Sequence, residues 1–184
     1  FSFDCYDDEE LLPQLGITNR AYMRRVAASC RRFAEEFGTA GENLLLTGST
    51  GVGKTFLSRC IAGEVMKRGH SVIYLSAGDL FEVFSKNKFS NEDEDGMQEM
   101  YRFVLECELL IIDDLGTELN NSFTSSQLFY CINERMSRKR STIISTNLSL
   151  AGLRDSYTDR VASRIMSGYT IIPLYGRDLR LRAV

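Results

Sequence analysis

The sequence predicts a three-layer α/β fold in which a parallel five-stranded sheet is flanked by helices. Two observations predict this class. The first is that the chain contains five short apolar runs with the length of strands. The second is that these runs alternate with longer stretches in which apolar residues recur every three or four positions, as in amphipathic helices. Strands that alternate with helices form parallel sheets, because each helix carries the chain back to the start of the next strand.

The elements follow in order along the chain. We expect strands at residues 43–47, 71–76, 109–113, 142–146 and 169–173. We expect an amphipathic helix at residues 19–37 before the first strand, and further helices at 55–68, 78–85, 96–107, 122–138 and 159–166.

The 184 residues, 43% of them hydrophobic, can bury one core, so we expect a single domain. Residues 1–40 would form an N-terminal extension and helix, and residues 41–184 the core. The chain begins at Phe1 rather than Met, so we expect any N-terminal partner-binding domain to lie outside this sequence. No apolar run approaches ~18 residues and no leader opens the chain, which predicts a cytoplasmic protein without a membrane span.

Residues 48–55 read GSTGVGKT and fit the pattern G-x-x-x-x-G-K-[S/T] between an expected strand and an expected helix. Backbone N–H groups in such a loop surround phosphate oxygens, while Lys54 reaches the β- and γ-phosphates and the Thr55 hydroxyl binds Mg²⁺. The pattern predicts a P-loop NTPase that uses ATP and Mg²⁺. The expected nucleotide-binding residues are Gly48, Ser49, Thr50, Gly51, Val52, Gly53, Lys54, Thr55 and Phe56.

The expected strand at 109–113 ends in two carboxylates, Asp113 and Asp114. In a P-loop protein this is a Walker B pattern, because a buried parallel strand delivers its C-terminal end to the crevice where ligands bind. We expect Asp113 to join Thr55 in the Mg²⁺ shell and Asp114 to act as the base for the attacking water. The next expected strand is followed by Asn147, whose amide can orient that water or contact the γ-phosphate.

Charge, cysteines and the one histidine add little. A net charge of −3 does not favour nucleic-acid binding by the molecule as a whole. The five cysteines are dispersed without C-x-x-C spacing, which indicates core packing rather than a disulfide framework or zinc site. His70, the only histidine, is expected in a turn.

The segments GSTGVGKT, LLIIDDLGTE, RSTIISTNLS, DRVASRI and YGRDLR together resemble bacterial replicative-helicase loaders of the DnaC/DnaI type, which are AAA+ ATPases, and the related IstB-like ATPases. The resemblance covers residues 40–180. It implies an ATPase, slow and stimulated by a partner or by DNA, that loads a hexameric replicative helicase, contacts single-stranded DNA and self-associates through its ATP site. It also implies that Arg164, with Arg160 as a second candidate, is an arginine finger for the neighbouring subunit, and that Asn147 is the sensor-1 residue.

Two departures from the family pattern affect the expected site. Asp114 stands where many AAA+ proteins carry Glu, so Glu118 stays open as an alternative base. No lid domain with a sensor-2 arginine is evident. The resemblance further implies that residues 78–107 form a helical element facing DNA. Aromatic and basic side chains there could stack on bases and contact phosphates, and core packing is the alternative role for the phenylalanines. These side chains are Phe81, Phe84, Lys86, Lys88 and Phe89.

Three other functions stay open. An IstB-like transposition helper would share the core but act with a transposase on duplex DNA. A P-loop small-molecule kinase would need an acceptor pocket and usually an arginine-bearing lid. A non-hydrolysing module that binds partners according to its nucleotide would show no turnover.

Overall fold

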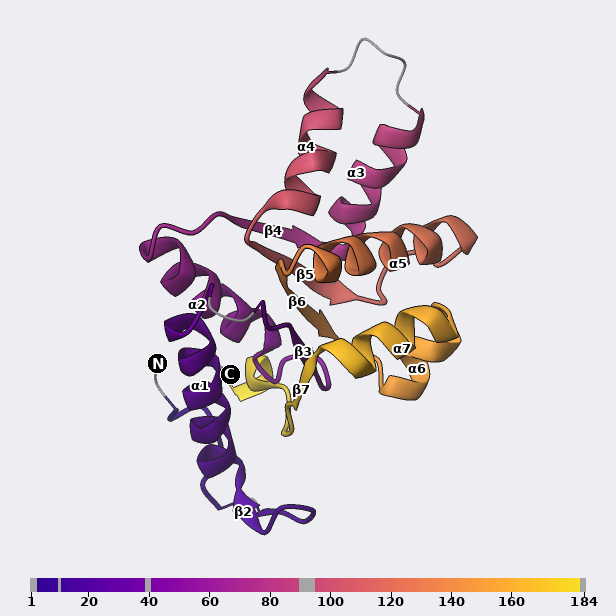
Figure 1. Ribbon diagram of the computed structural model, residues 1–184. Coiled ribbons are helices and arrows are strands. Elements are labelled where there is room, and N and C mark those ends of the chain that lie inside the picture. Colours follow the sequence, from indigo (N-terminus) through magenta and orange to yellow (C-terminus); the bar gives the residue numbers. More distant parts are fainter. Residues whose placement is uncertain (1–2, 10, 39–40, 90–94, 183–184) are drawn as a thin grey trace.

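The computed structural model describes residues 3–9, 11–38, 41–89 and 95–182. It confirms the parallel five-stranded sheet with helices on both faces (Figure 1). The strands are β3 (Leu44–Thr47), β4 (Val72–Ser76), β5 (Leu109–Leu115), β6 (Ser141–Thr146) and β7 (Thr170–Pro173). They lie in the order β4-β5-β6-β3-β7. This order places β5, β6 and β3 side by side, so the three segments expected to carry the site leave the sheet next to one another.

The helices divide between the two faces of the sheet. On one face, α1 (Asn19–Glu35) and α2 (Lys54–Lys67) pack on each other and on the sheet. The other face is covered by α3 (Ala77–Phe89), α4 (Asp95–Glu106), α5 (Ser122–Ser137), α6 (Leu150–Ser156) and α7 (Asp159–Gly168). In Figure 1, α3 and α4 project together from one end of the sheet.

The alternation of side chains along β5 explains its unbroken apolar sequence. Leu110 and Ile112 belong to the core under α3 to α7, whereas Leu109 and Ile111 belong to the core under α1 and α2. All four side chains are fully buried. A parallel strand that is covered on both faces needs apolar residues at every position, not at every second one.

Several elements differ from the expectation. A short antiparallel hairpin of β1 (Leu11–Leu12) and β2 (Ile17–Thr18) precedes α1. The structure also has α6 and a short 3₁₀ helix, η1 (Leu179–Arg182), that were not expected. These elements are too short for apolar periodicity to reveal them. In addition, α1 ends at Glu35 and α3 continues to Phe89, while the other expected helices and strands lie within a few residues of their expected bounds.

The hairpin of α3 and α4 is held by the phenylalanines that the sequence left open to DNA stacking. Phe81 and Phe84 are buried, and the Phe84 ring lies 5.6 Å from the Tyr101 ring of α4. Their role is therefore core packing. Lys86 is exposed and lies 2.5 Å from Glu82, and the side chains of Lys88 and Phe89 lie outside the described residues.

A fully buried arginine joins α5 to the edge of the sheet where the strands begin. The Arg135 guanidinium donates to the carbonyl oxygens of Val104, Cys107 and Ser141, at 2.8, 3.0 and 2.6 Å. Its Nε donates to the Thr142 hydroxyl at 2.9 Å. These bonds tie the end of α4 and the start of β6 to α5. Core packing is confirmed for three cysteines: Cys107 and Cys131 are buried in the core under α3 to α7, and Cys30 in the core under α1 and α2. It is wrong for Cys5, which is exposed, and Cys60 is only partly buried.

Candidate nucleotide-binding site

The P-loop connects β3 to α2 and leaves the start of that helix open. The N-cap of α2 is Gly53, and no side chain caps the helix there. The first N–H groups of a helix have no partner within it, and the helix dipole favours an anion at this end. The uncapped start of α2 therefore fits phosphate oxygens, as the motif predicts.

Lys54, the first residue of α2, is 4% exposed. Its Nζ donates to the carbonyl oxygens of Gly48, at 2.7 Å, and Ser49, at 2.8 Å, and to Oδ1 of Asn147. Burial lowers the pKa of Lys54, and the nearby Asp114 and Asp113 oppose that shift. The ammonium group is thus held at the end of β6 by neutral oxygens that a phosphate can replace.

Asp113 lies at the end of β5, buried behind the P-loop. Its carboxylate accepts hydrogen bonds from Thr55 Oγ1 at 3.2 Å, from the Tyr74 hydroxyl at 2.7 Å, and from the Ser145 hydroxyl. Burial raises the pKa of Tyr74 to about 12, so this hydroxyl stays a donor. The structure brings together Thr55 and Asp113, a hydroxyl and a carboxylate oxygen of the kind that Mg²⁺ prefers.

Asp114 faces the opposite way from its neighbour. Its backbone has φ 56°, its N–H donates to Ser145 Oγ at 2.9 Å, and the register of β5 with β6 shifts between Ile112 and Leu115. The shift turns the Asp114 side chain out of the sheet, so that it is exposed and lines the cavity beside the P-loop. Two adjacent carboxylates therefore have different surroundings, as their separate expected roles require.

The cavity has a volume of about 380 Å³. Its lining residues are Thr50, Gly51, Gly53, Lys54, Thr55, Phe56, Arg59, Asp114, Asn147, Leu179 and Arg180. Gly48, Ser49, Val52 and Asp113 are not among these lining residues. A larger cavity of about 560 Å³ lies between α1 and α2, but Arg59 is the one residue that it shares with the first. The smaller cavity is the one lined by Lys54, Thr55, Asp114 and Asn147, which are expected to carry the chemistry.

Sequence reasoning missed the C-terminal segment that closes over the P-loop. The Leu179 N–H donates to the Gly51 carbonyl at 3.1 Å, and the Arg180 N–H donates to Asp178 Oδ1 at 2.9 Å. Gly51 has φ 76°, and a Cβ there would lie 1.7 Å from Asp178 Oδ1. The segment YGRDLR was part of the family resemblance but had no assigned role. This segment places Arg180 in the cavity lining. No arginine from a lid domain was expected at the site from the sequence.

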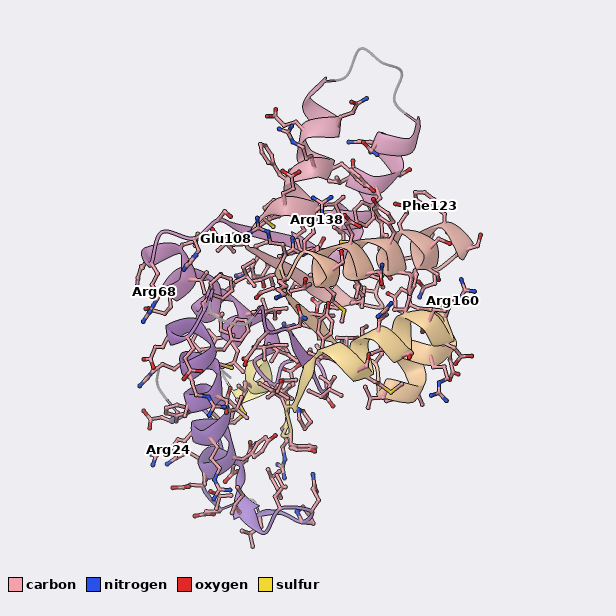
Figure 2. The ribbon with its side chains drawn as sticks, in the orientation of Figure 1. Arg24, Arg68, Glu108, Phe123, Arg138 and Arg160 are labelled. Atoms are coloured by element: carbon pink, nitrogen blue, oxygen red, sulfur yellow. The ribbon has the colours of Figure 1, made fainter. Side chains whose placement is uncertain are left out.

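Glu118 and the two candidate finger arginines lie outside the cavity lining. Both oxygens of the Glu118 carboxylate accept hydrogen bonds, from the Gly116 N–H at 3.0 Å and from the Tyr157 hydroxyl. Arg160 and Arg164 are exposed on α7. Figure 2 shows Arg160 on the side of the molecule opposite Arg24 and Arg68. Asp114 is therefore better placed than Glu118 as a base, and Arg160 and Arg164 lie on the exposed face of α7.

Comparisons with known proteins identify relatives of this chain in sequence and in structure. The model of a family described as IstB-like ATP binding protein matches residues 23–182. The replicative helicase loader DnaC of Buchnera aphidicola (subsp. Schizaphis graminum) is 26% identical over 148 residues, which are 80% of this chain and 60% of that protein. An ATP-binding protein of insertion sequence IS232 from Bacillus thuringiensis, itself described as putative, is 26% identical over 146 residues, 77% of this chain and 56% of that protein.

A crystal structure of the DnaC helicase loader has a TM-score of 0.74 at 25% identity, over 95% of this chain and 96% of that one. The fold is that of AAA+ P-loop ATPases. The chain spans about 60% of the length of the curated loader that it matches. Within the described residues, no helix is long and apolar enough to cross a membrane.

Proposed function

The chain belongs to the family of IstB-like ATP-binding proteins, and from that premise we propose that it is the ATP-hydrolysing domain of a DNA replication protein that loads a hexameric replicative helicase onto DNA. One observation carries the ATPase part of the proposal. Lys54 at the start of α2, Asp114 near the end of β5 and Asn147 directly after β6 line one cavity, with Thr55 and Asp113 in contact beside it. Similarity to DnaC loaders over most of the chain carries the replication part.

ATP binding depends on the loop and on Lys54. The N–H groups at the start of α2 receive the phosphates, and Lys54 exchanges the carbonyls of Gly48 and Ser49 for β- and γ-phosphate oxygens. Thr55 and Asp113 would hold Mg²⁺, which would neutralise phosphate charge in the complex with ATP. Arg59 and Arg180 add two further cations to the lining of the same cavity.

Hydrolysis depends on Asp114 and Asn147. Asp114 accepts a proton from the attacking water, and the Asn147 amide orients that water or the γ-phosphate. A carboxylate one methylene shorter than Glu reaches less far toward the water, so intrinsic turnover is slow and a partner or DNA stimulates it.

A neighbouring subunit completes the site. Arg164 of α7 is exposed and outside its own cavity, so it is available to the γ-phosphate on an adjacent copy, and Arg160 is the second candidate. A permanent planar charge suits the transition state of phosphoryl transfer. Self-association through the ATP site would then couple hydrolysis to assembly on single-stranded DNA in the cytoplasm.

The test measures both activities with the full-length protein. Wild-type protein should bind ATP, hydrolyse it faster with helicase and single-stranded DNA present, and deposit helicase on DNA in an ATP-dependent manner. Lys54→Ala should lose all three activities while keeping its circular-dichroism spectrum. Helicase deposition that is equal with and without the protein would remove the loading function, and absent turnover under every condition would remove the ATPase function.

A transposition helper is the second candidate, because an insertion-sequence ATP-binding protein aligns with this chain as well as the loaders do. Such a helper would bind a transposase and coat duplex DNA in an ATP-dependent manner. Co-purification of the full-length protein with a hexameric helicase or with a transposase separates the two functions.

A further inference from the structure

Glu118 is fixed in place although it lies in a loop. Its two carboxylate oxygens accept from the Gly116 N–H, at 3.0 Å, and from the Tyr157 hydroxyl. Tyr157 is 7% exposed and belongs to the core under α3 to α7. Burial, followed by the hydrogen bond to Glu118, raises the pKa of Tyr157, so the hydroxyl remains a neutral donor. A charged acceptor makes this hydrogen bond stronger than one between neutral groups.

Tyr157 occupies the joint between α6 and α7. It is the C-cap of α6, where its N–H donates to the Leu153 carbonyl at 3.0 Å. The next residue, Thr158, is the N-cap of α7 and accepts from the Val161 N–H. A displacement of Tyr157 therefore changes the position and direction of α7, and with them the position of the exposed Arg164 side chain.

On its other side, the hydrogen bond between Glu118 and Tyr157 connects to the segment that carries Asp114, the proposed base. The Thr117 hydroxyl donates to the Asp114 carbonyl at 2.9 Å. Gly116 has φ 101°, and a Cβ there would lie 2.5 Å from Leu148 Cδ1, so the loop fits closely against the segment after β6. Asp114 lines the nucleotide cavity. A short, tightly folded loop thus separates the carboxylate that faces nucleotide from the one that holds the α6–α7 joint.

We infer that the hydrogen bond between Glu118 and Tyr157 positions α7 relative to the loop that follows β5. This position would let Arg164 reach the nucleotide of a neighbouring subunit. Both are positioning residues, since neither lines the cavity. The inference rests on the proposed function, because it requires ATP hydrolysis and an arginine that acts between subunits. It also gives Glu118 a role other than that of the base.

The experiment mixes two variants whose sites are each incomplete. Lys54→Ala lacks a working phosphate site but keeps Arg164, whereas Arg164→Ala keeps the site but lacks the arginine. Turnover in the mixture arises where a Lys54→Ala subunit supplies Arg164 to an Arg164→Ala subunit. The rate of this mixture, with helicase and single-stranded DNA present, is the reference.

Tyr157→Phe is then added to one of the two mixed variants at a time. This substitution removes the hydroxyl and keeps the ring in the core. We expect turnover to fall about tenfold when the arginine-donating subunit carries the change, and less than about twofold when the site-bearing subunit carries it. Glu118→Gln in the donating subunit should give a similar loss, because an amide cannot accept both hydrogen bonds. Combining the two changes should cause no further loss, because the two residues act as a unit.

Tyr169→Phe is the matched control. Tyr169 is also 7% exposed and lies in the same core, but its hydroxyl is near Thr142 rather than Glu118. It should leave the rate unchanged in either partner. ATP affinity and the thermal midpoint are measured for every variant, because a merely structural role would lower the midpoint and act equally in both subunits.

Equal losses in the two partners, or a loss confined to the site-bearing subunit, overturn the inference. Unchanged turnover with Tyr157→Phe in the donating subunit does the same, and so does an unmodified mixture that recovers nothing while wild type is active. Absence of hydrolysis by wild type would instead overturn the proposed function. If Tyr157→Phe does not fold, Glu118→Gln decides the question by the same comparison.

Discussion

The two edges of the sheet each bury a cation among carbonyl oxygens, yet they do so with different consequences. At the edge where the strands end, Lys54 is 4% exposed and lines a cavity of about 380 Å³. At the edge where they begin, Arg135 is 0% exposed and donates to three backbone carbonyls. Lys54 has Asp113 and Asp114 near it, whereas every group that accepts a hydrogen bond from Arg135 among the described residues is neutral.

The difference indicates which buried charge serves stability and which serves binding. Removing the Arg135 side chain takes a charged donor away from three buried backbone carbonyls, and a buried acceptor that loses its donor destabilises the fold. Lys54 itself lines a cavity, so its ammonium group can leave these oxygens for a ligand. The same pairing of a cation with carbonyls is therefore structural at one edge and exchangeable at the other.

Replacing Arg135 should have the largest effect on stability. We expect Arg135→Met to lower the free energy of unfolding by about 3 kcal/mol or more, because buried carbonyls lose their charged donor. Arg138→Met is the matched control on the same helix, since Arg138 is exposed and pairs with Glu134 (Figure 2). The control should change the value by about 0.5 kcal/mol or less. Urea unfolding measures both, and equal midpoints for the two variants would contradict the contrast between the edges.

Replacing Lys54 should have the opposite effects: ATP binding is weakened and stability is kept. Lys54→Met should weaken ATP binding at least about 100-fold, because it removes a phosphate-neutralising charge. Its stability without nucleotide should equal or exceed that of wild type, since burial disfavours the charged lysine in the folded state. Lys67→Met, at an exposed position of the same helix, is the control. Titration with a fluorescent ATP analogue and thermal melting test both parts, and a large loss of stability in Lys54→Met would contradict them.

The two carboxylates at the end of β5 should separate binding from turnover. Asp113→Asn should lose the Mg²⁺ dependence of ATP affinity, because its buried carboxylate contacts Thr55. Asp114→Asn should bind ATP with Mg²⁺ normally and turn over about 100-fold more slowly or worse, because an amide cannot accept the proton. Affinity with and without Mg²⁺, and single-turnover rates, distinguish them. Normal turnover in Asp114→Asn would assign the base to another group.

Sequence reasoning found what depends on local pattern. Apolar periodicity located all five strands of the main sheet, and the P-loop motif located Lys54 and Thr55 because its spacing is read within eight residues. The opposite orientations of Asp113 and Asp114 were not predictable from their adjacency, because they depend on a register shift against β6. Arg180 was missed for a similar reason: its place in the cavity depends on the chain returning to Gly51 far along the sequence.

Arg180 gives a smaller test of the exchangeable edge. Arg180→Ala should weaken ATP binding about tenfold and leave the thermal midpoint without nucleotide almost unchanged, because one of the cations facing the phosphates is lost from an exposed position. Arg177→Ala, an exposed arginine in the same segment, is the control for general charge loss. Isothermal titration measures the affinities. Equal affinities for the two variants would show that Arg180 lines the cavity without contacting the nucleotide.

The smallest expected effect concerns pH at the edge where the strands begin. Glu108 accepts from His70 Nδ1 at 2.7 Å and from the Ser71 N–H at 2.9 Å, and these bonds, with His70 first, lower the pKa of Glu108 (Figure 2). A carboxyl whose pKa is lower in the folded than in the unfolded state contributes stability above its unfolded value, near 4.5, and loses it as pH falls through the folded value. Glu108→Gln should therefore melt a little below wild type at pH 7, by about 2 °C or less because the Glu108 side chain is partly exposed to solvent, and the gap should close below pH 4. Asp8, an exposed carboxylate paired with Arg20 near the N-terminus, is the control when changed to Asn. A gap between Glu108→Gln and wild type that stayed constant from pH 7 to pH 3 would show that the glutamate acts there through packing rather than through its charge.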